Sequence, residues 1–172
     1  MTFGRPPLLA LLQLLALCAL FLASAARADV YGDVRQLLRN GKLAEAEAQA
    51  DRHLKTKPRD PQMRYLKGLM QRETGRIAEA LETFRRLTED FPELPEPYNG
   101  LAVIHAAQGN YDLARTSLEL AIRANPAYAT AHENLGDLYS RMARQSYCKA
   151  LQNDPGNGDL RTRLAALGIT CP

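Results

Sequence analysis

The chain has 172 residues, of which 46% are hydrophobic and 24% charged, so its composition excludes a disordered or fibrous protein. The chain has 22 basic and 19 acidic residues. Two of the basic residues, Arg5 and Arg27, lie in the first 28 residues, and without them the rest of the chain has 20 basic and 19 acidic residues and a net charge of +1. We therefore expect no nucleic-acid partner. Runs of β-branched residues are few, which favours helices.

The first 28 residues are predicted to be a signal peptide. Arg5 precedes an apolar run from Leu8 to Ala23, and Ala26-Arg27-Ala28 fits the small-x-small rule for cleavage after Ala28. The competing interpretation is a retained membrane anchor. The apolar run is shorter than the ~20 residues that cross a bilayer, so we expect cleavage and no stable membrane anchor after it.

The rest of the chain repeats with a period of 34 residues, which is typical of helical arrays. Glycine, alanine and proline each recur at this spacing in a single register, as do the residues two places after each glycine. The positions are Gly41, Gly75 and Gly109; Ala46, Ala80 and Ala114; Pro58, Pro92 and Pro126; and Leu43, Ile77 and Tyr111.

Each period predicts a pair of antiparallel helices. The glycine follows a segment of helical periodicity and reaches positive φ without steric cost, so it ends the first helix and reverses the chain. The alanine allows the two helices to approach closely, and the proline stops the second helix because it cannot donate a backbone hydrogen bond.

The spacing and the residue types resemble those of the tetratricopeptide repeats. The second period has Gly68, Gly75, Ala80, Phe84 and Pro92 at the positions of that pattern. The resemblance implies an all-α solenoid of helix hairpins with repeats at residues 29–60, 61–94 and 95–128, a truncated repeat at 129–155, and a cap and tail at 156–172.

The fourth repeat lacks five residues, since Pro126 and Pro155 are only 29 apart, and the missing piece is the turn expected between Arg141 and Met142. The segment has strong helical propensity, so we predict one continuous helix from about Ala129 to Asn153. The alternative is a tight, kinked turn near Ser140 to Met142. A fused helix leaves its far half without a partner, and either the tail folds back on it or a second copy covers it as a homodimer through the carboxy-terminal end.

Cys148 and Cys171 remain after removal of the signal peptide, and an exported pair of cysteines forms either a disulfide or two free thiols. His53, His105 and His132 are far apart in the sequence, and no metal-binding, phosphate-binding or nucleophile–base motif is present. We therefore expect no catalytic site, no metal and no cofactor.

In this repeat family the first helix of each hairpin lines a concave groove, so the resemblance implies which residues face a partner. The corresponding positions are Tyr31, Arg35, Leu38, Gln62, Tyr65, Leu69, Arg72, Glu96, Asn99, Val103, Ala106, Thr130, Glu133 and Asp137. Their mixture of aromatic, aliphatic and charged side chains suits an extended peptide or a partner helix.

By analogy with exported members of the family, we expect a periplasmic location in a Gram-negative bacterium. The expected function is a non-catalytic scaffold that binds a peptide or another protein during cell-envelope assembly or secretion. Two alternatives are a periplasmic chaperone-like holder of unfolded clients and a regulatory subunit of a cell-wall enzyme.

Overall fold

The computed structural model describes residues 29–171, and all regular structure within this range is helical. The predicted signal peptide and its cleavage site lie outside the described residues. None of the described helices is both long and apolar enough to cross a membrane. The helices are α2 (Val30–Arg39), α3 (Leu43–Thr56), α4 (Pro61–Glu73), α5 (Ile77–Asp90), α6 (Pro95–Ala107), α7 (Tyr111–Ala124), α8 (Ala129–Asn153) and α9 (Gly158–Ala166).

The chain divides into two compact units, Met1–Gln49 and Ala50–Pro172. The described part of the first unit contains α2 and the beginning of α3. Asp29 caps α2 by accepting a hydrogen bond from the backbone N–H of Tyr31, at 3.2 Å. Val34 and Ala46 are completely buried, so the small residue of the first repeat belongs to the core.

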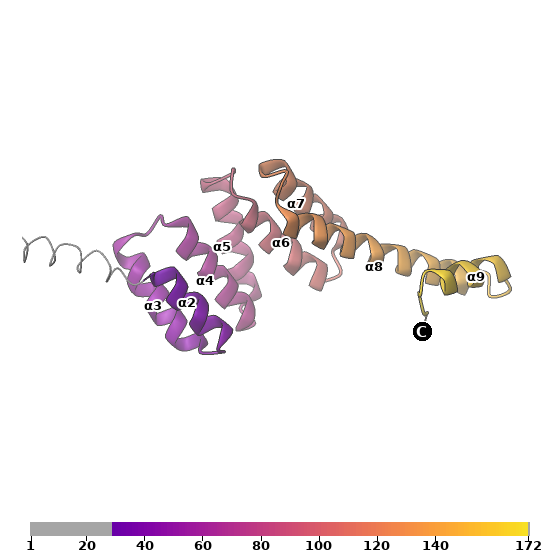
Figure 1. Ribbon diagram of the computed structural model, residues 1–172, viewed down its shortest axis with the longest axis horizontal. Coiled ribbons are helices and arrows are strands. Elements are labelled where there is room, and N and C mark those ends of the chain that lie inside the picture. Colours follow the sequence, from indigo (N-terminus) through magenta and orange to yellow (C-terminus); the bar gives the residue numbers. More distant parts are fainter. Residues whose placement is uncertain (1–28, 172) are drawn as a thin grey trace, which may run out of the picture. The chain divides into compact units, whose positions relative to one another are not determined.

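The second unit is a two-layered stack of helices (Figure 1). Within it, α4 pairs with α5 and α6 pairs with α7, and each following hairpin packs on the one before, since α5 contacts α6 and α7 contacts α8. In addition α4 contacts α6, and α6 contacts α8. One layer therefore consists of α4, α6 and the beginning of α8, and the other consists of α5 and α7. This arrangement confirms the predicted all-α fold of helix hairpins.

The turns have the predicted chemistry. Gly75 and Gly109 have φ of 75° and 77°, which a residue with a side chain rarely adopts. Proline stands at the start of α4 and of α6, where its missing N–H costs no helical hydrogen bond. Ala80 and Ala114 are completely buried at the approach of paired helices.

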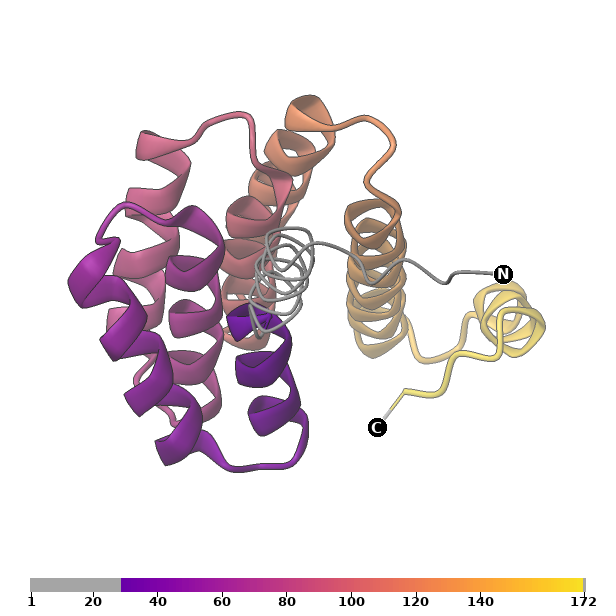
Figure 2. The same ribbon diagram turned by 60° about the vertical axis from the view of Figure 1, so that its left-hand side comes forward.

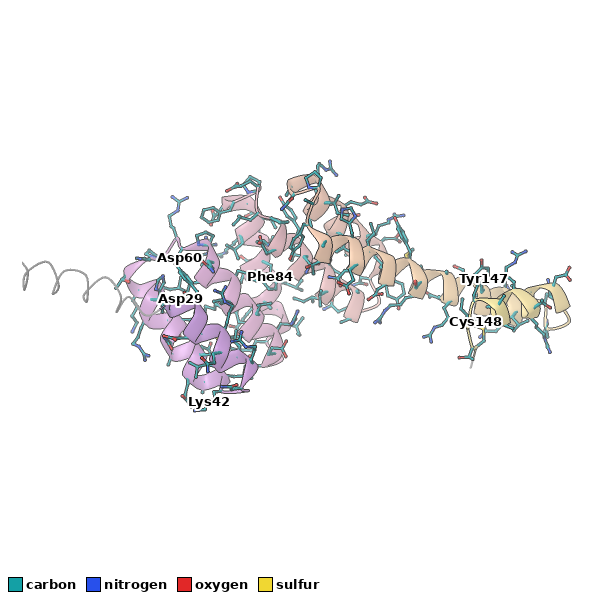
Figure 3. The ribbon with its side chains drawn as sticks, in the orientation of Figure 1. Asp29, Lys42, Asp60, Phe84, Tyr147 and Cys148 are labelled. Atoms are coloured by element: carbon teal, nitrogen blue, oxygen red, sulfur yellow. A yellow bond between two sulfur atoms is a disulfide. The ribbon has the colours of Figure 1, made fainter. Side chains whose placement is uncertain are left out.

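One phenyl ring links three helices in the core of the second unit. Phe84 of α5 is completely buried, and its ring fills the space beside Gly68 of α4 and Gly100 of α6. A β-carbon at Gly68 would lie 2.5 Å from the ring, and one at Gly100 would lie 2.9 Å from it. The two glycines therefore make room for the ring, and the ring couples successive repeats. Figure 3 labels Phe84.

The fourth repeat does not form a hairpin. Instead α8 runs without interruption over 25 residues, which confirms the predicted fused helix and shows that the alternative of a kinked turn near Ser140 was wrong. Such a helix is about 37 Å long at 1.5 Å per residue. Its second half extends past α7 (Figure 1).

The tail folds back on the extended half of α8. The view in Figure 2 is nearly along α8, with α9 beside it. Cys148 of α8 and Cys171 of the tail are joined in a disulfide, with their α-carbons 5.4 Å apart. Of the two alternatives for the cysteines, the structure has the disulfide, and the tail lies on the side of α8 that contains Cys148.

Candidate peptide-binding groove

The predicted groove residues of the second unit lie on three neighbouring helices of one layer, because α4 contacts α6 and α6 contacts α8. Helix α4 holds four of them, α6 holds four and α8 holds three. They are Gln62, Tyr65, Leu69, Arg72, Glu96, Asn99, Val103, Ala106, Thr130, Glu133 and Asp137. Tyr31, Arg35 and Leu38 lie on α2 in the first unit, where Arg35 pairs with Asp29 at 3.9 Å.

Tyr65 of α4 packs on the core. Its ring packs at a tilt on Phe84, with 5.7 Å between the ring centroids. Burial raises the pKa of the Tyr65 hydroxyl to about 12; nearby Tyr128 and Glu96 add to the increase and Arg72 opposes it. Arg72 of α4 and Glu96 of α6 therefore lie close enough to the Tyr65 hydroxyl for their charges to act on its pKa.

Tyr128 is a neighbour that the sequence analysis missed. It immediately precedes α8 and lies close enough to Glu96 for that carboxylate to affect it. Burial raises the pKa of the Tyr128 hydroxyl, a hydrogen bond with the Thr130 side chain lowers it, and Glu96 raises it. Because the expected groove positions were limited to the interiors of first helices, a residue between helices was not considered.

Asn99 has a different environment from the other groove positions. It is only 7% exposed, and its Oδ1 accepts a hydrogen bond of 2.7 Å from Nδ2 of Asn134. This bond joins α6 to α8 across 35 residues of sequence. Asn99 therefore holds two helices of the layer together, and most of its surface is not available to a partner.

A cavity of about 240 Å³ opens between α6 and α8. Val103 and Ala106 of α6 and Leu138 of α8 provide apolar walls, while Asp137 and Arg141 provide charged groups. The complete lining consists of Ala102, Val103, Ala106, Ala107, Leu118, Asn134, Asp137, Leu138 and Arg141. An apolar hollow with a few polar groups can hold an apolar side chain and fix the direction of the chain that bears it.

The remaining predicted positions fall into two sets. Tyr65 and Leu69 pack against the core cluster of α5 and α6 that contains Phe84, whereas Val103 lines the cavity beside α8. The apolar groove positions Tyr65, Leu69 and Val103 are thus divided between two neighbouring places. Gln62, Thr130 and Glu133 are exposed.

Within residues 29–171, no group of three or more His, Cys, Asp or Glu side chains is arranged to hold a metal ion. The side chains that this face offers are apolar groups, aromatic rings, amides and charged groups, one of which, Arg72, is paired with Glu73.

Models of known families match two stretches of the chain. One described as "Tetratricopeptide repeat" matches residues 31–95, and one described as "TPR repeat" matches residues 104–142. Together these matches span more than half of the chain.

Individual proteins of the same kind are also similar to this chain. The Arabidopsis thaliana protein "Tetratricopeptide repeat domain-containing protein PYG7, chloroplastic" is 32% identical over 83 residues, which are 45% of this chain and 28% of that protein. The chain therefore spans less than a third of the length of this relative.

Solved structures show the same fold. The crystal structure of TTC0263, a TPR protein of Thermus thermophilus, matches 80% of this chain and 96% of its own with a TM-score of 0.62 and 24% identity. The structure of Naa15/Naa10 bound to HypK-THB matches 81% of this chain and 22% of its own, with a TM-score of 0.61 and 18% identity.

Proposed function

Since the chain belongs to the tetratricopeptide-repeat family, whose members generally bind other proteins and are generally non-catalytic, we propose that its inner layer binds a segment of another protein. The segment is an extended peptide or one helix, and it lies across α4, α6 and the beginning of α8. The observation that supports this proposal best is the cavity between α6 and α8, where Val103 and Ala106 are only half-buried and face an apolar hollow.

The layer has two regions that a bound segment can use. The cavity takes an apolar side chain, and its Asp137 and Arg141 can pair with charges on either side of that anchor. One hairpin away, Tyr65, Arg72 and Glu96 offer an aromatic edge with a cation and an anion beside it. An apolar anchor flanked by charged residues is therefore the sequence pattern that we expect in the partner.

We further propose that the protein acts after export, in the periplasm of a Gram-negative bacterium, during cell-envelope assembly or secretion. The predicted signal peptide supports export, and so does the disulfide between Cys148 and Cys171, because disulfides persist in oxidising compartments.

Mass spectrometry of the protein from a periplasmic extract is expected to find Asp29 as the first residue. Recovery of the intact chain from the cytoplasm alone would contradict this proposal.

Val103→Arg is expected to weaken partner binding at least about tenfold, or ~1.4 kcal/mol, because it places a charge in the apolar hollow. The affinity is measured by calorimetry or fluorescence with a partner recovered from the native envelope. Leu113→Arg is the matched control, since Leu113 is an exposed aliphatic residue on α7, in the other layer. Equal losses for the two variants would count against the groove, provided that both retain the helical circular-dichroism spectrum of the original protein.

A further inference from the structure

Helix α8 contains residues that correspond to both helices of a hairpin, although it cannot form one. In the second repeat, Gly68 of the first helix lies against Phe84 of the second. In the third, Ala102 and Leu118 occupy the same positions and share one core cluster. In the fourth, the corresponding residues are Gly136 and Tyr147, and both lie on α8. Eleven residues along one straight helix separate them by about 16 Å, so they cannot meet within one chain.

The face of α8 that should receive a second helix is consequently open. A β-carbon built at Gly136 would have no atom within 4 Å, in contrast to Gly68. Tyr139, one turn further along, is 48% exposed, and Ala143 and Ala150, which continue the same face at helical spacing, are exposed as well. The tail lies beside this face but does not close it. The disulfide holds the tail on the side of α8 that contains Cys148, and Gly168 to Thr170 line a hollow with Ser140 and Arg144, while Tyr139, Ser140, Ala143 and Arg144 all remain exposed.

The exposed charges of α8 are separated along its length. Glu133 and Asp137 lie in the first half of the helix, Arg141 lies at its middle, and Arg144 and Lys149 lie in the second half. At 3.6 residues per turn, Arg144 borders the side of Gly136 and Ala143, whereas Lys149 points away from it. No ion pair joins any of these five side chains to another residue in the described part of the chain. Helix α5 differs, because its Glu82 accepts hydrogen bonds from both Arg85 and Arg86.

We propose that two copies of this chain pair through α8, antiparallel and centred near Ser140, so that each copy supplies the helix that the other lacks. Antiparallel pairing places the acidic half of each α8 against the basic half of the other, whereas parallel pairing would place like charges together. Arg144 of one copy then lies opposite the turn of helix α8 that runs from Glu133 to Asp137 in the other copy. This contact occurs twice because the interface is two-fold symmetric.

The apolar contacts follow from the same register. A helical side chain leans toward the amino terminus of its own helix, so Tyr147 of one copy leans over Gly136 of the other and fills the place that Phe84 fills beside Gly68. The two Tyr139 rings meet near the two-fold axis. The deleted turn lies between Arg141 and Met142, and loss of such a hinge turn favours the exchange of helices between copies over closure of the hairpin within one copy.

The test is the mass of the protein in solution by size exclusion with light scattering, for the chain as it accumulates in cells. A dimer is expected at about 100 µM, a concentration that populates an association with a Kd as weak as ~10 µM. Arg144→Glu, or Glu133→Arg together with Asp137→Arg, is expected to raise the dissociation constant at least about tenfold. Combining all three changes restores the opposite charges and is expected to return the constant to within about threefold of its original value.

Tyr139→Glu should also separate the copies, and Leu167→Glu, at another exposed apolar residue, should not. A strict monomer at this concentration would overturn the proposal, as would a dimer that the charge reversals leave unchanged or a triple variant that stays monomeric. These measurements use no binding partner, and Arg144→Glu and Tyr139→Glu change no residue assigned to the groove, so failure of this proposal is distinguishable from failure of the proposed groove.

Discussion

Phe84→Ala is expected to destabilise the second unit by about 3–5 kcal/mol, the range for removal of a buried aromatic ring. The ring is completely buried, and the glycines on either side cannot fill the space that it leaves. Since Gly68 belongs to one repeat and Gly100 to the next, the loss should lower the stability of both hairpins together. Chemical denaturation monitored by circular dichroism gives the free energy of unfolding.

Leu113→Ala serves as the control, because Leu113 is 54% exposed and a surface truncation usually changes stability by no more than ~0.5 kcal/mol. A Phe84→Ala variant that lost no more stability than this control would show that the ring does not couple the repeats.

Cys148→Ser is expected to cost the carboxy-terminal segment about 3 kcal/mol, the entropy estimate for a loop whose ends are 23 residues apart. The effect should be local. Among the described helices, α9 contacts α8 alone. Release of the tail therefore separates α9 from the only helix that it packs on, and it leaves α4 to α7 undisturbed. Hydrogen exchange should show faster exchange in Gly158–Ala166 and unchanged exchange in Pro61–Ala124.

Treatment of the original protein with a reductant should reproduce this pattern, and the same treatment of Cys148→Ser should change nothing further. Unchanged protection of α9 in the variant would mean that its packing on α8 is sufficient without the covalent link.

The helices and turns could be predicted because they depend on local chemistry. Each structural feature requires one residue type at one position: glycine where φ is positive, proline two residues after a helix end, and alanine where two helices cross. These residue types recur every 34 positions, so the sequence shows where each feature lies. The fused helix could be predicted for the same reason: the turn between Arg141 and Met142 is missing, and nothing else in the segment interrupts a helix.

The contacts between helices could not be predicted in the same way. The bond between Asn99 and Asn134 and the position of Phe84 beside Gly100 depend on the rotation and spacing of helices that are far apart in sequence. The position of Asn99 within its repeat predicted that it belongs to the inner layer. That position did not indicate that the side-chain amide of Asn134 would donate a hydrogen bond to the Asn99 side chain. Likewise, the packing of Tyr65 on Phe84 depends on how two helices lie against each other, so it could not be predicted from the residue type at either position.

The central claim is that a partner chain lies against the inner layer formed by α4, α6 and α8. The most direct measurement is photo-crosslinking in the native cell, with a benzophenone side chain at position 103 in one strain and at position 113 in another. Crosslinks to one discrete partner from position 103, and none from position 113, are the predicted result. Crosslinks to that partner from position 113 alone would contradict the claim, because they would place it on the opposite layer.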